Sequence, residues 1–348
     1  MSRPGAAAAQ GGAAAVDSEG VAWHYGAPLN EQRALMTTTG IVDRSHRKVI
    51  RVAGADAPEF LNNLLSQKLD DVPDGFGASA LDLDIQGRIL HHADVAYTDG
   101  VFYLDLPASQ AGTFLDFLQK MVFWSEVEVS ETDLGVLTLL GGGVSLPEEL
   151  SPAFIREVDW RGPQRRDIAV EREQLDAAVD KLTDAGAQLT GLMAYTAERV
   201  KAGEPEKDTD LDDKSIPHEV PQWIGRDDRP GAVHLEKGCY RGQETVARVE
   251  NLGRSPRLLV LLQLDGSAPQ EPATGEQIEY GGRKVGRLGT VVHDCDYGPI
   301  ALGLVKRSAL DVGELNIGMV AAAVDAASIP ADEGDKAGRA AINKLRGR

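Results

Sequence analysis

The sequence predicts an α+β protein in which two units of the ferredoxin-like, split-βαβ type are followed by a small antiparallel β-barrel. Between residues 49 and 202, short strand-like runs alternate with stretches whose apolar residues recur at helical spacing. Beyond residue 255, closely spaced strand-like runs are separated by glycine-rich turns, which is typical of a barrel. The chain has 348 residues, 42% of them hydrophobic, and is long enough for two or three domains.

The first unit is expected at residues 21–131, after a low-complexity tail at 1–20 that we expect to be disordered. Asp56 is placed to cap the first helix, with Pro58 in its first turn, and a hairpin turn is expected at Gly87. In chain order, the predicted elements are a strand at 49–52, a helix that continues to Leu69, strands at 78–85, 88–97 and 101–106, a helix carrying Phe114, Phe117, Leu118 and Met121, and a strand at 127–129.

The second unit is expected at residues 132–254. Its predicted elements are strands at 136–140 and 167–170 and helices at 172–185 and 192–202. The helices are expected to end at Gly186 and Gly203, because glycine adopts the left-handed conformation of a helix C-terminus without strain. The following stretch, 204–228, contains nine acidic and three basic residues and is interpreted as a long loop or linker, and loops of this length in compact proteins are often functional.

The barrel is expected at residues 255–326, and the last residues, 327–348, are expected to form a flexible tail. The predicted barrel strands are 257–264, 277–280, 284–293 and 300–305.

Eight consecutive residues concentrate most of the chemistry that the sequence offers: Lys237, Gly238, Cys239, Tyr240, Arg241, Gly242, Gln243 and Glu244. The two glycines suit a tight turn or a close approach of the backbone. A helix is expected to begin near Gly242, so that Cys239 lies just ahead of its positive end with Lys237 and Arg241 nearby. These surroundings favour a thiolate. Cys239 is therefore interpreted as a reactive thiol, with a small buried residue in a turn as the alternative.

The net charge of −18 indicates that the chain as a whole is repelled by nucleic acids and by anionic membranes. The sign reverses between residues 237 and 257, where five cations face two acids. Such a patch could hold a polyanion, or it could be an ordinary solvated face. Its cations are Lys237, Arg241, Arg248, Arg254 and Arg257.

Cys239 and Cys295 are the only cysteines, and their spacing fits neither a disulfide framework nor a metal site. No apolar run approaches the length of a membrane span, and the Ala/Gly-rich start lacks the core of a signal peptide. We therefore expect a cytoplasmic protein without a metal site and without membrane contact.

The octet resembles the K-G-C-Y-x-G-Q-E signature of the YgfZ family, which belongs to the wider superfamily of the glycine-cleavage T-protein. Every position matches, with Arg241 at the variable site, and a weaker resemblance extends from about Trp23 to about Val324. The resemblance implies a T-protein-like core that binds tetrahydrofolate. It also implies an accessory role in the assembly or repair of iron–sulfur clusters in client enzymes, including one that modifies tRNA, with Cys239 as the functional thiol and no self-contained catalysis.

Two departures from T-proteins bear on the chemistry. The acids of the motif G-G-x-x-D-D are replaced by His91 and His92, and the nearest acid, Asp94, is displaced by two residues. A neutral imidazole stabilises a developing cation less well than a carboxylate does. A folate-dependent aminomethyltransferase is therefore the second hypothesis, and a protein that binds tRNA directly is the third, which the net charge disfavours.

The second departure concerns the pterin ring of folate. In the segment that matches L-R-x-E-x-G, Arg199 is present but Lys201 replaces the glutamate that grips the pterin. An ammonium group has only donors, whereas a carboxylate accepts from two adjacent N–H groups. We expect cations to hold the folate through its glutamate tail instead, although Arg199 could equally form an ion pair on the helix surface. The candidate folate contacts are Arg199, Lys201, Arg248, Arg254 and Arg257.

Overall fold

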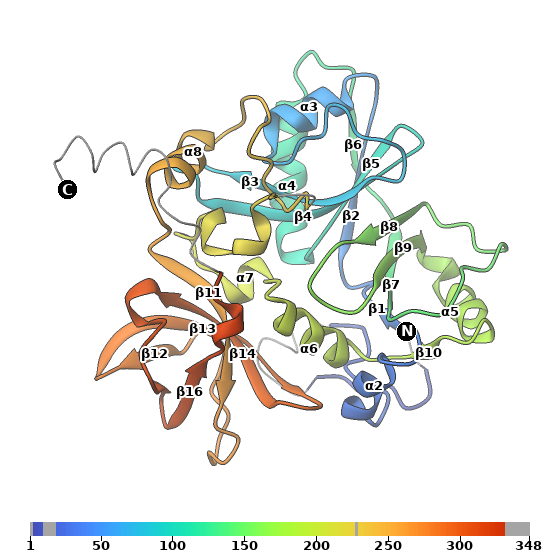
Figure 1. Ribbon diagram of the computed structural model, residues 1–348. Coiled ribbons are helices and arrows are strands. Elements are labelled where there is room, and N and C mark those ends of the chain that lie inside the picture. Colours follow the sequence, from blue (N-terminus) through green and yellow to red (C-terminus); the bar gives the residue numbers. More distant parts are fainter. Residues whose placement is uncertain (1–2, 10–18, 227–228, 331–348) are drawn as a thin grey trace.

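The computed structural model describes residues 3–9, 19–226 and 229–330. Two five-stranded sheets and a closed six-stranded barrel surround a central group of helices (Figure 1). The predicted α+β class with a C-terminal barrel is confirmed. Of the tail predicted at 327–348, residues 331–348 lie outside the described residues, and the first residues continue a 3-10 turn at Ala326–Ser328.

The first sheet has the order β3-β4-β5-β2-β6, and all of its neighbouring strands are antiparallel. Two helices cover one face of this sheet. Apolar side chains of the strands and of these helices form a core between them, which includes Ile50, Phe102 and Phe114. Its elements are β2 (Lys48–Ala53), α3 (Ala57–Leu64), β3 (Gly77–Leu83), β4 (Ile89–Thr98), β5 (Val101–Leu106), α4 (Ala108–Met121) and β6 (Glu128–Glu131).

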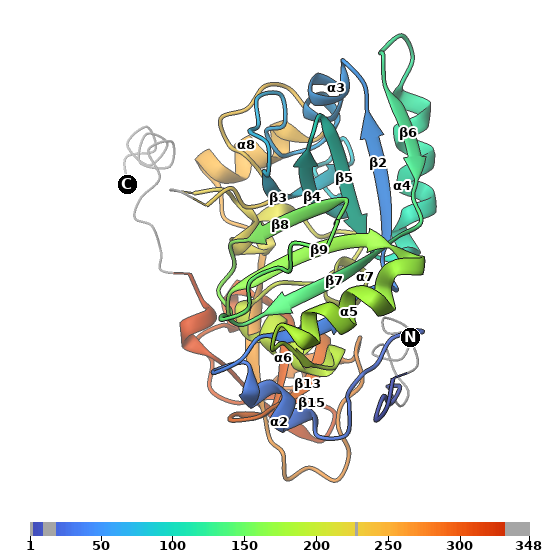
Figure 2. The same ribbon diagram turned by 90° about the vertical axis from the view of Figure 1, so that its right-hand side faces the viewer.

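The second sheet has the order β10-β1-β7-β9-β8, and only the pairing of β1 with β10 is parallel. Helix α5 covers its outer face, and Leu137, Ile168 and Leu182 belong to the core between them (Figure 2). Its elements are β1 (Gly40–Asp43), β7 (Leu134–Leu140), β8 (Phe154–Val158), β9 (Arg165–Glu171), a 3-10 turn η1 (Arg172–Gln174), α5 (Leu175–Asp184) and β10 (Gln188–Leu189).

The barrel closes through the pairing of β11 with both β14 and β16. Apolar side chains fill its interior, including Leu262, Ile278 and Leu288. Its strands are β11 (Arg257–Leu264), β12 (Gln277–Tyr280), β13 (Arg283–Asp294), β14 (Gly298–Lys306), β15 (Leu315–Ile317) and β16 (Val320–Val324), and short 3-10 turns, η4 (Arg307–Ala309) and η5 (Ala326–Ser328), follow β14 and β16.

The connecting helices join the three parts. A central core of buried side chains comes from the first sheet, α6, the loop after it, α8 and the barrel, and Trp223 is its largest member. The connecting elements are α2 (Pro28–Ala34), α6 (Leu192–Ala202), α7 (Lys207–Asp210), α8 (Gln243–Leu252) and the 3-10 turns η2 (Pro217–Glu219) and η3 (Pro221–Trp223). None of the helices in the described part of the chain is long and apolar enough to cross a membrane.

Several details differ from the sequence-based expectations, and three of them concern the organisation of the chain. Strand β1 precedes the whole first sheet in the chain yet lies in the second sheet, so the segment predicted as the first unit, 21–131, contributes to both sheets. Part of the tail predicted to be disordered is ordered, because Ala7 pairs with His24 and Arg3 forms an ion pair with Asp180. The predicted loop at 204–228 contains α7 and two 3-10 turns.

Candidate functional site

A cluster of buried charges joins the two sheets. Asp105 comes from β5 of the first sheet and Asp167 from β9 of the second, and the guanidinium of Arg156 on β8 contacts both carboxylates. The Oδ1 and Oδ2 atoms of Asp167 also lie 3.6 Å from Arg44 and 2.7 Å from Arg165, respectively. The members of this intersheet cluster are Arg44, Arg47, Asp94, Asp105, Arg156, Arg165 and Asp167.

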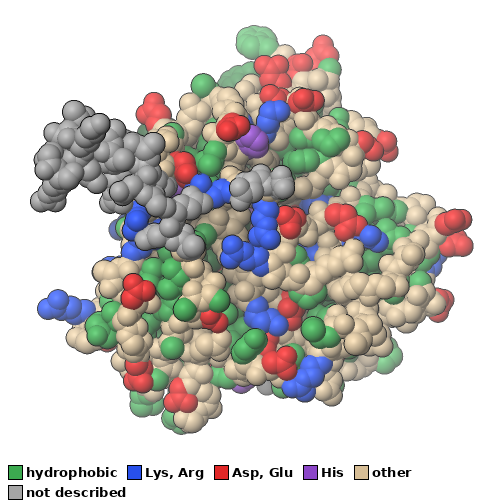
Figure 3. Space-filling model, in the orientation of Figure 1, with side chains coloured by type: hydrophobic (Ala, Val, Ile, Leu, Met, Phe, Trp, Pro, Cys, Tyr) green, Lys and Arg blue, Asp and Glu red, His purple; other side chains and the backbone are tan. Residues whose placement is uncertain are grey.

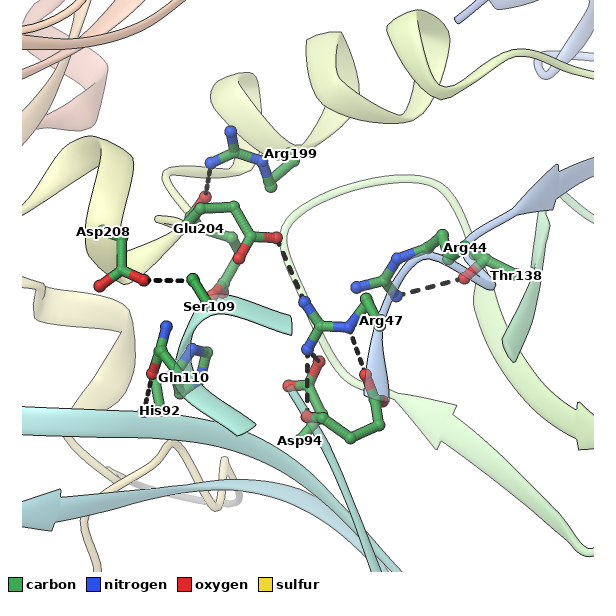
Figure 4. A network of polar contacts seen from close by, with 12 residues as sticks. Arg44, Arg47, His92, Asp94, Ser109, Gln110, Thr138, Arg199, Glu204 and Asp208 are labelled. Carbon is green, nitrogen blue, oxygen red and sulfur yellow. Dashed lines mark hydrogen bonds and ion pairs between the residues drawn. The ribbon is translucent and has the colours of Figure 1, made fainter. Parts of the chain in front are cut away.

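Asp94 and Arg47 extend the cluster toward the α6 loop, and Figure 4 shows Arg47 pointing to Asp94. Burial alone would raise the pKa of Asp94, but Arg156, Arg165 and Arg47 together hold it well below its usual range. Asp94 is therefore ionised. The three carboxylates of the cluster lie within 4.8 Å of one another, and guanidinium groups separate them, so we interpret the group as an ion-pair network.

Beside this cluster lies a small cavity, which we call the inner pocket, with a volume of about 70 Å³. Its lining includes two indole rings, two carboxylates and two buried guanidinium groups, contributed by Trp160, Trp223, Asp94, Glu204, Arg156 and Arg165. Three residues that line it carry buried polar atoms without a hydrogen-bond partner among the described residues: Arg156 (Nε and Nη1), Gln222 (Oε1) and Trp223 (Nε1). Orphaned atoms of this kind call for a polar ligand or water.

A larger surface cleft of about 610 Å³, the outer cleft, adjoins the inner pocket, because Arg229 and Pro230 line both. The cleft also presents Lys68 and His234. Arg229 is half exposed and lies 3.6 Å from Asp159. Figure 3 shows Lys and Arg side chains gathered near the middle of one face, where the two sheets and the barrel meet. The lining of the outer cleft has three cations, Lys68, Arg226 and Arg229, and two acids, Asp71 and Glu236, so the cleft is locally less acidic than the chain as a whole.

The signature octet packs against the first sheet rather than the second unit to which the sequence assigned it. Lys237 donates from Nζ to the carbonyl oxygens of Asn62 and Leu65 at the end of α3, and burial lowers its pKa to about 8. Its ammonium thus binds the free carbonyl groups at the C-terminus of a helix, where the helix dipole stabilises a positive charge. Arg241 pairs with Asp82 and lies over the ring of Phe117.

Helix α8 begins after Gly242, as predicted. Gly242 has φ +83°, and a Cβ there would lie 2.6 Å from the carbonyl oxygen of Asp84, so only glycine fits. The carboxamide of Gln243 accepts from the backbone N–H of Tyr240, whose ring is partly buried against the central core. Gly238 has no close neighbour and no left-handed backbone, so the predicted requirement for glycine fails there.

Cys239 is exposed, and Gly238 and Glu244 are exposed as well. The buried-residue alternative for Cys239 is therefore wrong. Cys295 is partly buried at the end of the barrel strand β13, and the two thiols are both free. The fold thus explains Lys237, Tyr240, Gly242 and Gln243, and leaves Cys239 available for contact with another molecule.

The residues predicted to hold folate do not form one site. Arg199 is buried and lies 2.8 Å from Asp210, so it is not an ion pair on the helix surface. Lys201 pairs with Glu198 at 2.8 Å and with Asp294 at 2.9 Å. Arg257 is engaged by Asp212 and Glu219. Arg248 and Arg254 are exposed.

The two histidines at the T-protein acid positions have different surroundings. Nδ1 of His91 lies 2.8 Å from Asp82 and its Nε2 lies 2.9 Å from Thr113. His92 is buried against the indole of Trp223, with ring centroids 4.5 Å apart, and burial lowers its pKa. His92 is therefore neutral and supports a wall of the inner pocket.

Comparisons with known proteins agree with this architecture. No family model matches the chain. It is 28% identical to the tRNA-modifying protein YgfZ of Klebsiella pneumoniae over 261 residues, which cover 69% of this chain and 76% of that protein. It is also 23% identical over 298 residues to a chloroplastic protein of Arabidopsis thaliana, which covers 78% of this chain; the chain spans 66% of that relative's length.

Among solved structures, the chain is similar to the aminomethyltransferase T of the glycine cleavage system from Bartonella henselae, with a TM-score of 0.70 and 21% identity, covering 87% of this chain and 90% of that one. The fold is thus that of the T-protein class. Within that class the chain is similar to YgfZ proteins, several of which match 67–77% of its length at 24–28% identity, and the octet matches the YgfZ signature at every position.

The first prediction compares the two glycines of the octet. Replacing Gly242 with alanine should lower the free energy of unfolding by about 1–3 kcal/mol, because a non-glycine residue is strained at this φ and its Cβ meets the hairpin backbone. Gly238→Ala is the matched control and should change it by less than about 0.5 kcal/mol. Urea denaturation measures both, and equal losses would contradict this description of the octet.

The second prediction concerns the thiols. In the native protein, Cys239 should be alkylated well before Cys295, because Cys239 is exposed while burial, aided by Asp294 and Asp296, raises the pKa of Cys295. Brief treatment with iodoacetamide followed by peptide mass spectrometry measures the order, with Cys239→Ser to identify the peptide. Preferential labelling of Cys295, or labelling of Cys239 only after unfolding, would show that the thiol is not available.

Proposed function

We propose that this protein binds a reduced folate and, as an accessory protein, supports the assembly or repair of iron–sulfur clusters in client enzymes, including tRNA-modifying ones. The observation that carries folate binding is the inner pocket. It combines flat indole walls with unsatisfied buried donors on Arg156 and Trp223 and an unsatisfied acceptor on Gln222. A pterin ring is flat and has donors and acceptors along its edges, so these groups are complementary to it.

The free volume of the inner pocket holds a few water molecules and is smaller than a pterin ring. The polar groups of the lining are complementary to a pterin ring, but the ring can enter only if the side chains between the inner pocket and the outer cleft move aside. Arg229 is one of these residues, and its side chain is half exposed with a contact of 3.6 Å to Asp159. Rotations of side chains at a binding site commonly accompany binding. The ring would then occupy the inner pocket and the glutamate tail the outer cleft, near Lys68 and Arg229.

The support for a role with iron–sulfur clients is the YgfZ signature and the exposure of its thiol. Cys239 and Glu244 are exposed, although the fold uses most of the other signature residues for packing and capping. A client protein can therefore reach the thiol directly. The YgfZ relatives are named tRNA-modifying proteins, which suits a tRNA-modifying client.

An aminomethyltransferase is the second candidate, and the T-protein fold favours it. Against it stand the replacement of the two motif acids by His91 and His92 and the engagement of Asp94 by three arginines. Direct binding of tRNA is the third candidate, and the net charge of −18 opposes it.

Calorimetric titration with mono- and polyglutamyl tetrahydrofolate tests the proposal. Both should bind, and the polyglutamyl form should bind more tightly by an amount that falls with salt, because exposed ion pairs are screened over about 10 Å at 0.1 M salt. Arg229→Ser should remove about two- to fivefold of the polyglutamate gain, in line with one exposed ion pair. Arg248→Ser, in the patch first predicted to hold the tail, is the matched control and should leave that gain unchanged.

Absence of binding by either folate would contradict the proposal. If only the Arg248 variant lost the gain in affinity for polyglutamyl folate, the glutamate tail would bind to the cationic patch at residues 237–257, as the sequence predicted.

A further inference from the structure

We infer that Glu204 anchors the pterin ring in this chain, in place of the glutamate that Lys201 replaces, and that it makes ligand binding depend on the release of a proton. The inference rests on the proposed folate binding. It concerns a residue outside the matched T-protein motif, three positions further along the chain, in the loop that follows α6.

The backbone of Glu204 is held firmly. Gly203 ends α6 in the left-handed conformation, with φ 74°. The backbone N–H of Glu204 then donates to the carbonyl of Arg199, and its own carbonyl accepts from Nη1 of Arg199 at 2.7 Å (Figure 4). Arg199 is itself fixed by Asp210 and Thr290. The side chain of Glu204 therefore starts from a fixed point at the edge of the inner pocket.

The carboxylate of Glu204 differs from its acidic neighbours. Glu206 lies 3.5 Å from Arg47, and Asp210 lies 2.8 Å from Arg199. Within the described part of the chain, the Glu204 carboxyl has neither a hydrogen bond nor an ion pair of 4.0 Å or less, and the residue lines the inner pocket together with Asp94 and Trp160. A carboxyl that is placed at a pocket and left without a protein partner is available to a ligand.

Lys201 cannot take this role. Its ammonium lies between Glu198 on the same helix and Asp294 at the end of the barrel strand β13, so α6 directs it toward the barrel. Both partners would have to be given up before Lys201 could reach a ligand, and it would bring only donors.

Protonation of Glu204 follows from its surroundings. Burial raises the pKa of Glu204 to about 7; Asp94 on β4 adds to the rise, whereas Arg165 on β9, Arg199 on α6 and Arg161 in the loop before β9 oppose it. Near neutral pH the carboxyl is thus partly protonated. A pterin presents adjacent N–H donors that two carboxylate oxygens accept together, while the protonated acid offers one acceptor fewer. Binding therefore selects the ionised form and displaces a proton.

Titration of the full-length protein with tetrahydrofolate monoglutamate between pH 6 and pH 8 tests the inference. Because only the ionised fraction binds, the wild-type affinity should be about tenfold lower at pH 6 than at pH 8. Calorimetry in buffers of different ionisation enthalpy should detect proton release near pH 7. Glu204→Gln should bind more weakly at pH 8, by about tenfold or more, and should lose the pH dependence.

Glu173→Gln is the matched control, because Glu173 is an exposed glutamate of η1 that does not line the pocket. It should behave as the wild type does. Glu204→Asp keeps a titrating carboxylate on a shorter side chain, so it should bind more weakly but retain the dependence on pH.

Stability provides the check on folding. A carboxyl with a raised pKa favours the folded state while it is protonated, and that contribution is lost as the pH rises from about 4.5 through 7. Glu204→Gln stays neutral, so it should melt no lower than the wild type at pH 8. Folate binding that is unchanged in Glu204→Gln, with the same pH dependence, would overturn the role of Glu204 alone. Absence of binding by the wild type at every pH would instead overturn the proposed function.

Discussion

The contact of Arg156 with Asp105 and Asp167 is the interaction on which the rest of the structure depends. It places one guanidinium between a strand of each sheet, in a position with almost no solvent exposure. A buried ion pair adds little net stability over an apolar pair, but loss of one partner leaves an uncompensated buried charge. The cluster therefore favours the arrangement of the two sheets in which its charges are paired, and three of its members, Asp94, Arg156 and Arg165, line the inner pocket.

The signature octet applies a second constraint on the other side of the first sheet. Lys237 donates a hydrogen bond to the end of α3, and Arg241 forms an ion pair with Asp82 on β3. Gly242 packs closely against the backbone of the hairpin between β3 and β4. Three separate elements therefore fix the loop that carries Cys239. The exposed thiol makes no contribution to this packing, so the fold alone gives no reason for a cysteine at position 239.

Strong periodic patterns made most elements predictable from the sequence. Strand β11 has its predicted bounds because it is apolar at every position except Arg257 and Gln263, between Pro256 and Asp265. Two of the missed strands lack such signals: β10 has two residues, and β1 has four that are all buried, so neither shows an alternation. The acidic composition of 204–228 concealed α7, whose Asp210 is buried as the partner of Arg199.

The site could be predicted only in part. The octet was visible because its residues are consecutive, whereas the inner pocket unites Asp94, Arg156 and Glu204 from three distant segments. One signal was available: charged residues stand inside otherwise apolar strands, as Asp105 and Asp167 do, and buried charges require partners. Which charges meet depends on how the two sheets pack, and no local pattern encodes that. The pairing of Lys201 with Asp294 is nonlocal for the same reason.

The central claim is that the pterin ring of a folate occupies the inner pocket. The chain has four tryptophans, of which Trp160 and Trp223 line this pocket, while Trp124, in the loop between α4 and β6, is 98% exposed and lines neither the inner pocket nor the outer cleft. Fluorine NMR of protein labelled with 5-fluorotryptophan, with each resonance assigned by substitution, reports on all four at once. Saturation with tetrahydrofolate should shift the resonances of Trp160 and Trp223 and leave that of Trp124 in place. Binding that leaves Trp160 and Trp223 unshifted would contradict the claim and place the ring elsewhere.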